Sequence, residues 1–202
     1  MPKKINQSDI FTAAVDVYSQ QGYINTSMRE IAQRVSINEA TLFRRFGTKA
    51  ELLTQALTDL LSRADIANVT FSGVLETDLY NIAVAYKKTN ALLGAAVLNL
   101  MTELSRHKEL QAAAIVLNQN TARITAILQQ YQQTGQLIPC DPIILLTQFI
   151  APLIIRAQFG RALGQTKDDS FKAMTDVRNH VDGFLRGHQG ITNDNKKNTK
   201  KQ

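Results

Sequence analysis

The sequence is poor in residues that would mark a secreted, metal-binding or catalytic protein. It has one cysteine, Cys140, so no disulfide can form within the chain, which is typical of a reducing compartment. Its three histidines, His107, His180 and His188, are far apart, and none has the spacing of a zinc site. A phosphate-binding glycine loop is also missing. We therefore expect no metal, no cofactor and no enzymatic activity.

Residues that interrupt helices are also scarce. Only four prolines and ten glycines occur in 202 residues, and apolar residues recur every three or four positions almost throughout. The alternating pattern of strands is almost absent. The most apolar stretch, residues 142–155, is shorter than the roughly 18 residues that a membrane helix needs. No signal-peptide pattern opens the chain. The sequence predicts a soluble, cytoplasmic, all-α protein with about nine helices.

The formal net charge of +6 is concentrated at the two ends. Residues 1–55 hold seven basic and five acidic side chains, and the tail from Gly187 holds four lysines against one aspartate. The long middle part is therefore nearly neutral, and the high overall pI says little about nucleic acid. We expect residues 187–202 to be a disordered basic tail. The sparse central charge favours a neutral or lipophilic ligand over a multiply charged one.

One stretch has the pattern of two short helices joined by a tight turn. Ser27 and Glu30 have the spacing of a capping box, in which each side chain satisfies a free N–H at a helix start. The helical pattern stops at residues 36–38, and Asn38 is a natural cap for a second helix. Two helices separated by a three-residue break are typical of a helix-turn-helix.

A third helix begins directly after this pair. Thr48 and Glu51 repeat the capping-box spacing, and Lys49 stands in the first turn. A helix N-terminus carries partial positive charge and free N–H groups, so it suits a phosphate. The polarity of the preceding helix, with Arg44 and Arg45 outside its apolar face, indicates nucleic-acid binding.

Residues 10–53 resemble the DNA-binding domain of the TetR (tetracycline repressor) family of bacterial transcription regulators. Many matching elements stand in fixed register over some forty residues, which makes the resemblance specific. They are Ala13, Ala14, Val17, Tyr18, Gly22, Tyr23, Thr26, Arg29 to Ala32, Ile37, Thr41 to Phe43, Phe46, Lys49 and Leu52.

Three positions depart from the family pattern. Ser36 stands where the family usually has a turn glycine, which tolerates positive φ without strain, so we expect a small stability cost or a slightly different turn. Arg45 replaces a frequent histidine and keeps a phosphate donor. Phe43 replaces a tyrosine and removes one hydroxyl.

The resemblance implies a domain order and a way of reading DNA. Residues 1–47 would form a three-helix DNA-binding domain, 48–67 a connecting helix and 68–186 a larger ligand-binding and dimerisation domain. Each recognition helix of a homodimer would enter a major groove of a near-palindromic operator. We expect phosphate contacts from Ser27, Arg29, Phe43, Arg44, Arg45, Thr48 and Lys49, and base-edge contacts from Asn38, Glu39, Ala40 and Thr41.

The larger domain is expected to contain helices over residues 75–89, 91–105, 108–133, 141–163 and 167–184. Residues 91–104 are apolar almost all round, which predicts burial at the domain centre. The last two helices carry more apolar surface than one protomer covers, which favours a two-fold interface of four helices. Its predicted residues are Ile150, Ile154, Phe171, Met174, Val177, Val181 and Phe184.

Central helices of mixed polarity supply the candidates for an effector pocket. These are Tyr86, Leu93, Asn99, Met101, Thr102, Ile127, Tyr131, Phe149 and Phe159. The sequence thus favours a ligand-responsive repressor that a small effector releases from DNA. A constitutive DNA-binding dimer without an inducer and a helical scaffold for another protein remain alternatives. A helical enzyme would require His107 or His180 to lie in a pocket with an acid–base partner.

Overall fold

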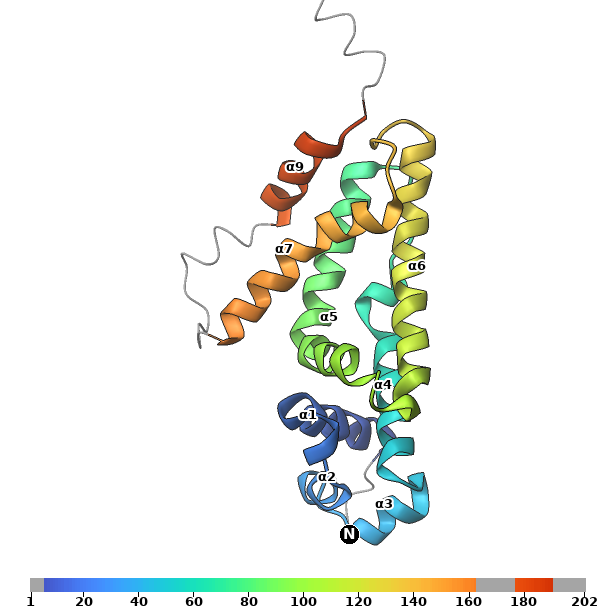
Figure 1. Ribbon diagram of the computed structural model, residues 1–202, viewed down its shortest axis with the longest axis vertical. Helices are drawn as coiled ribbons and strands as arrows, with labels where there is room; N and C mark the ends of the chain where they lie inside the picture. The colour runs from blue at the N-terminus through green and yellow to red at the C-terminus, as the bar shows by residue number, and fades with distance from the viewer. Residues whose placement is uncertain (1–5, 163–176, 191–202) are drawn as a thin grey trace, which may run out of the picture. The chain divides into compact units, whose positions relative to one another are not determined.

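The computed structural model describes residues 6–162 and 177–190, which form eight α-helices and two short 3₁₀ helices (Figure 1). No β-strand occurs within these ranges, and one isolated bridge joins Leu137 to Gln189. The predicted all-α class is confirmed. The elements are α1 (Gln7–Asn25), α2 (Met28–Arg34), α3 (Glu39–Phe46), α4 (Lys49–Arg63), η1 (Asp65–Asn68), α5 (Leu75–Glu103), η2 (Lys108–Leu110), α6 (Gln111–Gln133), α7 (Pro142–Ala162) and α9 (Val177–His188).

The helices group into two compact units that do not follow chain order. The N-terminal unit comprises the chain up to Ala67 together with Thr89–Asn120, and the second unit comprises Asn68–Lys88 and the chain from Thr121 onward. The long helices α5 and α6 each contribute one half to either unit. The domain predicted over residues 68–186 is thus divided between the two units.

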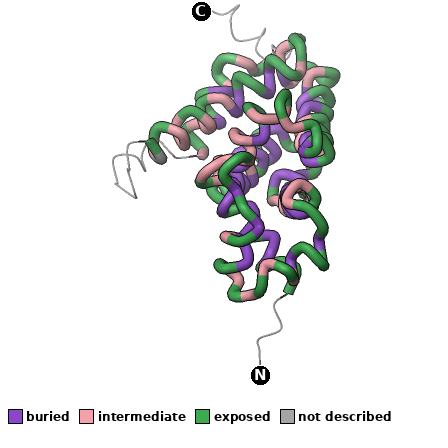
Figure 2. Tube along the Cα trace, turned by 60° about the horizontal axis from the view of Figure 1, so that its bottom comes forward, coloured by how far each residue is buried: buried purple, intermediate pink, exposed green. Residues whose placement is uncertain are grey.

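The N-terminal unit is built on one apolar core. Its residues recur at helical spacing, so each helix turns one face inward, as the buried segments in Figure 2 show. The largest fully buried side chains from α1 to α4 are Ile10, Tyr18, Ile31, Leu42, Leu52, Leu53, Leu57 and Leu61. The C-terminal half of α5 adds Leu93, Ala96 and Leu100 to the same core. Burial of one such leucine contributes about 1.5–3 kcal/mol relative to exposure.

The second unit is held by a buried polar contact and an aromatic cluster. Asp78 is buried and accepts hydrogen bonds from the Tyr131 hydroxyl at 2.6 Å and the Ser72 N–H at 2.9 Å, which ties the start of α5 to α6. The ring of Phe149 in α7 packs against Phe184 of α9, with 4.8 Å between the centroids. The hydrogen bonds to Asp78 satisfy a polar group that burial would otherwise penalise, and the ring contact holds α9 on α7.

The prediction of two helices over residues 75–89 and 91–105 was wrong, because α5 runs without a break from Leu75 to Glu103. Thr89 and Asn90 have low helix propensity, but neither stops a helix as proline does. The expected all-round burial of residues 91–104 was also wrong. Leu93 is buried, whereas Leu92 and Met101 are 77% and 65% exposed.

The predicted tail also begins too early at Gly187. Helix α9 continues to His188, whose ring Nε2 lies 2.9 Å from the Gln148 side-chain oxygen, and Gln189 pairs with Leu137. These contacts place residues 187–190 in the folded second unit. Residues 191–202 lie outside the described part of the chain.

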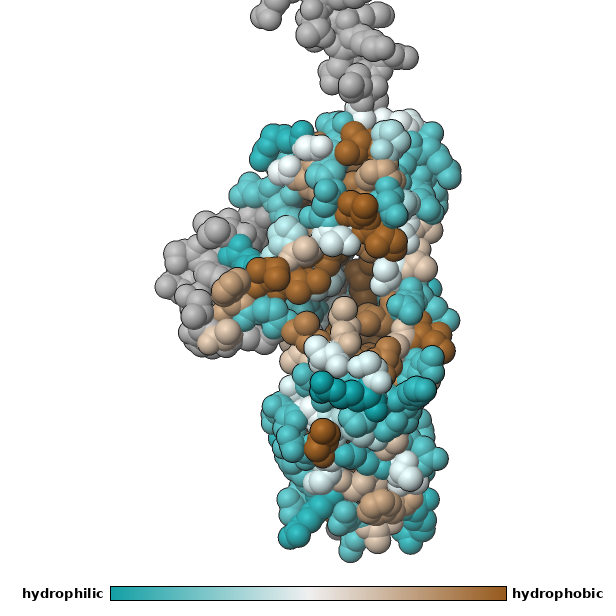
Figure 3. All heavy atoms as spheres, in the orientation of Figure 1, coloured by the Kyte–Doolittle hydropathy of each residue, from teal (hydrophilic) through white to brown (hydrophobic). Residues whose placement is uncertain are grey.

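Helix α7 lies where residues 141–163 predicted a helix, but its apolar stretch is longer than the predicted residues 142–155. Its N-cap is as predicted, because the Asp141 carboxylate accepts the Ile143 N–H at 2.7 Å. Residues Pro142–Gly160 are long and apolar enough to cross a membrane by length and composition. The prediction that the most apolar stretch is too short for a membrane helix was therefore wrong. One such helix is weak evidence for a membrane span. Only 22% of this window is buried, and apolar side chains gather on its surface (Figure 3).

Candidate nucleic-acid interface

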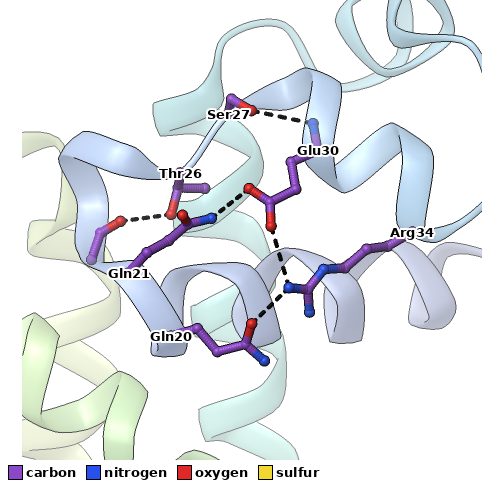
Figure 4. Close-up of polar contacts among 7 residues, drawn as sticks. Gln20, Gln21, Thr26, Ser27, Glu30 and Arg34 are labelled. Carbon is purple, nitrogen blue, oxygen red and sulfur yellow. Dashed lines mark hydrogen bonds and ion pairs between the residues drawn. The ribbon is translucent and has the colours of Figure 1, made fainter.

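Side chains fix the turn between α1 and α2. Gly22 takes a positive φ of 76°, and the Thr26 N–H and hydroxyl both donate to its carbonyl, at 3.2 and 2.7 Å (Figure 4). The Ser27 hydroxyl then accepts the Glu30 N–H at 3.2 Å, which confirms the predicted cap of α2. This geometry starts α2 at a defined angle to α1.

The Glu30 side chain does not complete the predicted capping box. Its carboxylate instead accepts the Gln21 amide at 2.5 Å and pairs with Arg34 at 3.2 Å (Figure 4). Arg34 also donates to the Gln20 side chain at 2.7 Å. Glu30 and Arg34 therefore bind α2 to α1. Ser27 and Arg29, at the start of α2, are the residues that remain exposed there.

The turn between α2 and α3 takes the backbone conformation that favours glycine. Ser36 has a φ of 56°, and the N–H of Ile37 donates to the Ala32 carbonyl at 3.0 Å. A residue with a Cβ is strained at this φ, which agrees with the small cost expected at this position. The serine thus keeps the tight turn of a helix-turn-helix.

Helix α3 has one buried face and one exposed polar face. Asn38 caps it as predicted, because its side-chain oxygen accepts the Ala40 N–H at 2.8 Å. Leu42 and Phe46 are buried, whereas Arg44 and Arg45 are exposed in the last turn. This helix therefore presents an amide and two guanidinium groups to solvent.

The start of α4 lies next in the chain and has a complete capping box. The Thr48 N–H donates to the Glu51 carboxylate at 2.7 Å, and the Glu51 N–H donates to the Thr48 hydroxyl at 3.2 Å. The hydrogen bonds from Thr48 lower the pKa of Glu51. Gly47, with a φ of 75°, supplies the sharp link from α3, because a Cβ there would strike the Glu51 carboxylate.

Lys49 makes contacts within the domain. Its ammonium donates to the carbonyls of Tyr23 and Ile24, at 2.7 and 3.3 Å, and lies 4.4 Å from the centre of the Tyr23 ring. Burial lowers the pKa of the Lys49 ammonium. The side chain thus ties α4 to the end of α1, and one further N–H remains for a phosphate.

Sequence reasoning missed Glu103, at the C-terminal end of α5. Both of its carboxylate oxygens accept the Tyr23 N–H, at 3.0 and 3.2 Å. The Tyr23 ring also packs on His107, and burial together with the Glu109 carboxylate raises the pKa of Tyr23 to about 12. Eighty residues separate the partners, so no local pattern could reveal this joint between α1 and α5.

The eleven predicted DNA contacts all lie between Ser27 and Lys49, and all are at least partly exposed. Glu39, Thr41 and Lys49 are half-buried, and the other eight are exposed. Arg45 makes a 3.4 Å bond to Gln7 and lies over the Phe46 ring. The structure thus brings these residues onto the exposed faces of α2, α3 and the start of α4.

The predicted effector residues do not come together in one place, because they divide between the two units. The Asn99 amide donates to the Tyr18 carbonyl at 2.8 Å, and Tyr131 donates to Asp78, so both side chains have structural partners. Ile127 and Phe149 are buried in the fold, Met101, Thr102 and Phe159 are exposed, and Tyr86 is half-buried. Leu93 lines a cavity between α1, the end of α4, η1 and α5.

The predicted dimer residues differ in how exposed they are in a single chain. Ile150, Val181 and Phe184 are buried within one protomer, so their side chains are not available to a partner in this conformation. Ile154 and Val177 are half-exposed, and Phe171 and Met174 lie outside the described residues. The exposed large apolar residues of α7 are Ile143, Ile144, Ile155 and Phe159.

The two histidines that an enzyme would have required have structural neighbours. The His180 Nε2 lies 2.8 Å from the Phe149 carbonyl, and burial lowers the pKa of its imidazole. His107 lies at the junction of α5 and η2, 3.5 Å from the Glu109 carboxylate. Over residues 6–162 and 177–190, no three His, Cys, Asp or Glu side chains form a group that could hold a metal ion.

Residues 10–56 match the family model described as bacterial regulatory proteins, tetR family. The N-terminal domain belongs to the TetR family. A related protein, the HTH-type transcriptional repressor Rv3405c of Mycobacterium tuberculosis, is 41% identical over 51 residues, which cover 25% of this chain and 27% of that protein. This chain therefore matches only about a quarter of that relative's length. This relative is named as a transcriptional regulator.

A weaker similarity to other proteins extends over most of the chain. The negative transcriptional regulator IcaR of the biofilm operon icaADBC in Staphylococcus epidermidis is 21% identical over 188 residues, which cover 88% of this chain and 97% of IcaR. The TetR-family regulator PfmR of Thermus thermophilus has a TM-score of 0.68 at 16% identity, over 91% of this chain and 98% of PfmR. The fatty acid degradation regulator FadR of Bacillus halodurans has a TM-score of 0.66 at 16% identity, over 90% and 99%. At these identities the solved structures establish the fold alone.

Proposed function

We propose that this TetR-family protein is a homodimeric transcription repressor of the cytoplasm that binds a near-palindromic operator and leaves it when a small effector binds. The proposed DNA binding is supported chiefly by the exposure of one face of α3. The turn at Ser36 and the buried side chains Leu42 and Phe46 hold α3 so that its polar, basic face is exposed. A short helix presented in this way fits the major groove.

The exposed side chains divide by chemistry into two roles. Arg29, Arg44 and Arg45 carry charges that suit phosphates, which position the domain without reading sequence. Asn38 and Thr41, at the start of α3, suit base edges, and so do Glu39 and Ala40. Because the Asn38 oxygen already caps α3, its amide N–H groups remain for an acceptor on a base.

The exposed side of α7 supports the dimer. Ile143, Ile144, Ile155 and Phe159 are each more than half exposed in a single chain. Apolar side chains concentrated on one helix in this way favour a partner surface, and a second copy gives the two reading heads that a palindrome requires. The choice of repressor over activator rests on the relatives, since Rv3405c is named a repressor and IcaR a negative regulator.

DNA binding is tested with the full chain and duplex DNA from upstream of its own gene, by fluorescence anisotropy at several salt concentrations. We expect Arg44→Ala to weaken binding to all sequences alike and to reduce the salt slope by about one unit. Thr41→Ala should change sequence preference and leave the slope unaltered. Arg123, exposed on α6, is the matched control, and Arg123→Ala should leave both quantities unchanged.

Two outcomes would count against the proposal. Equal affinity of the wild type for upstream and unrelated DNA would remove sequence-specific regulation and favour a helical scaffold for another protein. An unchanged salt slope in Arg44→Ala would remove the phosphate role of Arg44.

A further inference from the structure

The last turn of α3 is joined to the start of α1 by a polar and an aromatic contact. Gln7 is the first residue of α1, and its side-chain oxygen accepts a hydrogen bond from Arg45 Nη2 at 3.4 Å. Phe11 follows one turn later on the same face of α1, and its ring packs on Phe46 with 5.7 Å between the centroids. Both phenylalanine rings are buried. Helix α1 thus contacts two consecutive residues of α3.

The Arg45 guanidinium is held by two groups at once. Its Cζ lies 5.0 Å from the centre of the Phe46 ring, and the Gln7 oxygen binds one of its nitrogens. The face of a phenyl ring attracts a cation, and Phe46 belongs to the apolar core, so the ring is a fixed platform. The Arg45 side chain is nevertheless exposed, and a guanidinium has five N–H donors, of which the bond to Gln7 uses one. Arg45 is therefore placed in advance for an anion that arrives from solvent.

The preceding residue, Arg44, lacks such contacts. It is also exposed in the last turn of α3, but its side chain makes no hydrogen bond, ion pair or ring contact with residues 6–162 or 177–190. Arg44 thus loses its rotamer freedom only on binding, whereas Arg45 has lost part of it in the free protein. Ordering a long side chain at an interface lowers affinity, so ordering it beforehand raises affinity.

We propose that Gln7 is a positioning residue for DNA binding, which holds the Arg45 guanidinium over Phe46 in an orientation that suits a phosphate. Gln7 carries no charge and acts through Arg45. The sequence indicated no role for Gln7, because 38 residues separate it from Arg45. The phosphate in this inference rests on the proposed function, whereas the contacts among Gln7, Arg45 and Phe46 do not.

The test is a double-mutant cycle on the full chain, with fluorescence anisotropy and duplex DNA from upstream of its own gene. We expect Gln7→Ala to weaken binding by about three- to tenfold, the effect of freeing one long side chain. The salt slope should stay unchanged, because the same charges face the DNA. Arg45→Ala should weaken binding and also reduce the slope. In the Arg45→Ala background, Gln7→Ala should have no further effect.

Three controls separate positioning from other roles. In the Arg44→Ala background, Gln7→Ala should still weaken binding by the same factor as in the wild type. Gln111→Ala changes an exposed glutamine that is the first residue of α6, as Gln7 is of α1, and should leave affinity unchanged. The midpoint of thermal unfolding of Gln7→Ala should stay within about 2 °C of the wild type. A larger fall would show that Gln7 stabilises the domain, and it would overturn the positioning role.

Two outcomes of the cycle would also overturn the proposal. One is an unchanged affinity of Gln7→Ala in the wild-type background. The other is equal weakening by Gln7→Ala with and without Arg45, which would show that Gln7 acts on DNA independently. Neither result contradicts the proposed function, which fails instead if the wild type binds upstream and unrelated DNA equally. In that case the same cycle on unrelated DNA still tests Gln7, because a phosphate contact does not depend on sequence.

Discussion

At the scale of single residues, Ser36 is where the chain departs most clearly from an unstrained backbone. Its φ of 56° is the one positive value at a non-glycine residue in the described part of the chain. The left-handed conformation costs an L-residue about 1–2 kcal/mol, and glycine avoids that cost. Glycine also loses about 0.5–1 kcal/mol more on folding because its unfolded chain is freer.

We therefore expect Ser36→Gly to raise the free energy of unfolding by about 0.5–1 kcal/mol, the difference between these two effects. Urea unfolding followed by circular dichroism measures it. Ser36→Ala is the control, because it keeps the Cβ at the same φ and should not stabilise the protein. A Ser36→Gly variant less stable than the wild type would show that the serine side chain, and not the backbone, decides this turn.

Local rules predicted the helix caps correctly. The caps at Ser27, Asn38, Thr48 and Asp141 were read from the sequence because a cap joins atoms only two or three residues apart. The side chain of Glu30 shows the limit of such rules. Its spacing predicted a bond back to Ser27, but Gln21 and Arg34 lie within reach and take the carboxylate instead.

At the scale of helices, the joint between α1 and α5 is the feature that the sequence did not reveal. The Glu103 carboxylate accepts the Tyr23 N–H just after α1 is interrupted at Gly22. A Cβ at Gly22 would lie 2.6 Å from a Glu103 side-chain oxygen, so any other residue here would require the Glu103 carboxylate to shift, and it would also be strained at the positive φ. Asn99 adds bonds to the Tyr18 and Ser19 carbonyls in the same region.

We expect Glu103→Ala to lower the free energy of unfolding by about 1.5–3 kcal/mol, because it removes a charged acceptor from a partly buried N–H. Glu103→Gln keeps an acceptor and should cost less. The control is Glu76→Ala, at an exposed position in the first turn of the same helix, which should change stability by about 0.5 kcal/mol or less. Urea unfolding ranks the three variants. Equal stability of Glu103→Ala and Glu76→Ala would contradict the role of this joint.

The length of α5 and the exposure of Leu92 were also mispredicted because both depend on packing by distant parts of the chain. Propensity at Thr89 and Asn90 is a weak signal, and packing on either side of them decides whether the helix continues. Apolar composition also cannot say which side of a helix the rest of the chain covers. Leu92 therefore looked like a core residue in the sequence, and it lies at the open side of a cavity in the structure.

At the scale of the whole molecule, the proposed binding to a near-palindromic operator requires two chains. Val181 and Phe184 were predicted to face the partner, but burial in one protomer makes them unsuitable for a test of the dimer. Ile155 and Phe159 of α7 are 55% and 59% exposed in a single chain, so charges there should not disturb the protomer.

We expect the double substitution Ile155→Glu and Phe159→Glu to convert the proposed dimer to a folded monomer, since like charges at the centre of an interface are strongly unfavourable. Multi-angle light scattering should show the mass fall to 22.5 kDa, with an unchanged helical circular dichroism spectrum. The control pair, Leu92→Glu and Met101→Glu, places the same charges on exposed positions of α5 and should stay dimeric. A double variant of α7 that keeps the dimer mass would place the interface elsewhere.

The most direct test of the central claim is a selection of bound duplexes from a random DNA library with the full-length protein. We predict enrichment of one near-palindromic sequence whose half-sites lie about one helical turn or slightly more apart, because a two-fold dimer presents α3 twice. Arg44→Ala should enrich the same sequence more weakly. Failure of the wild type to enrich any sequence, or enrichment of a single half-site without a symmetric partner, would contradict the account.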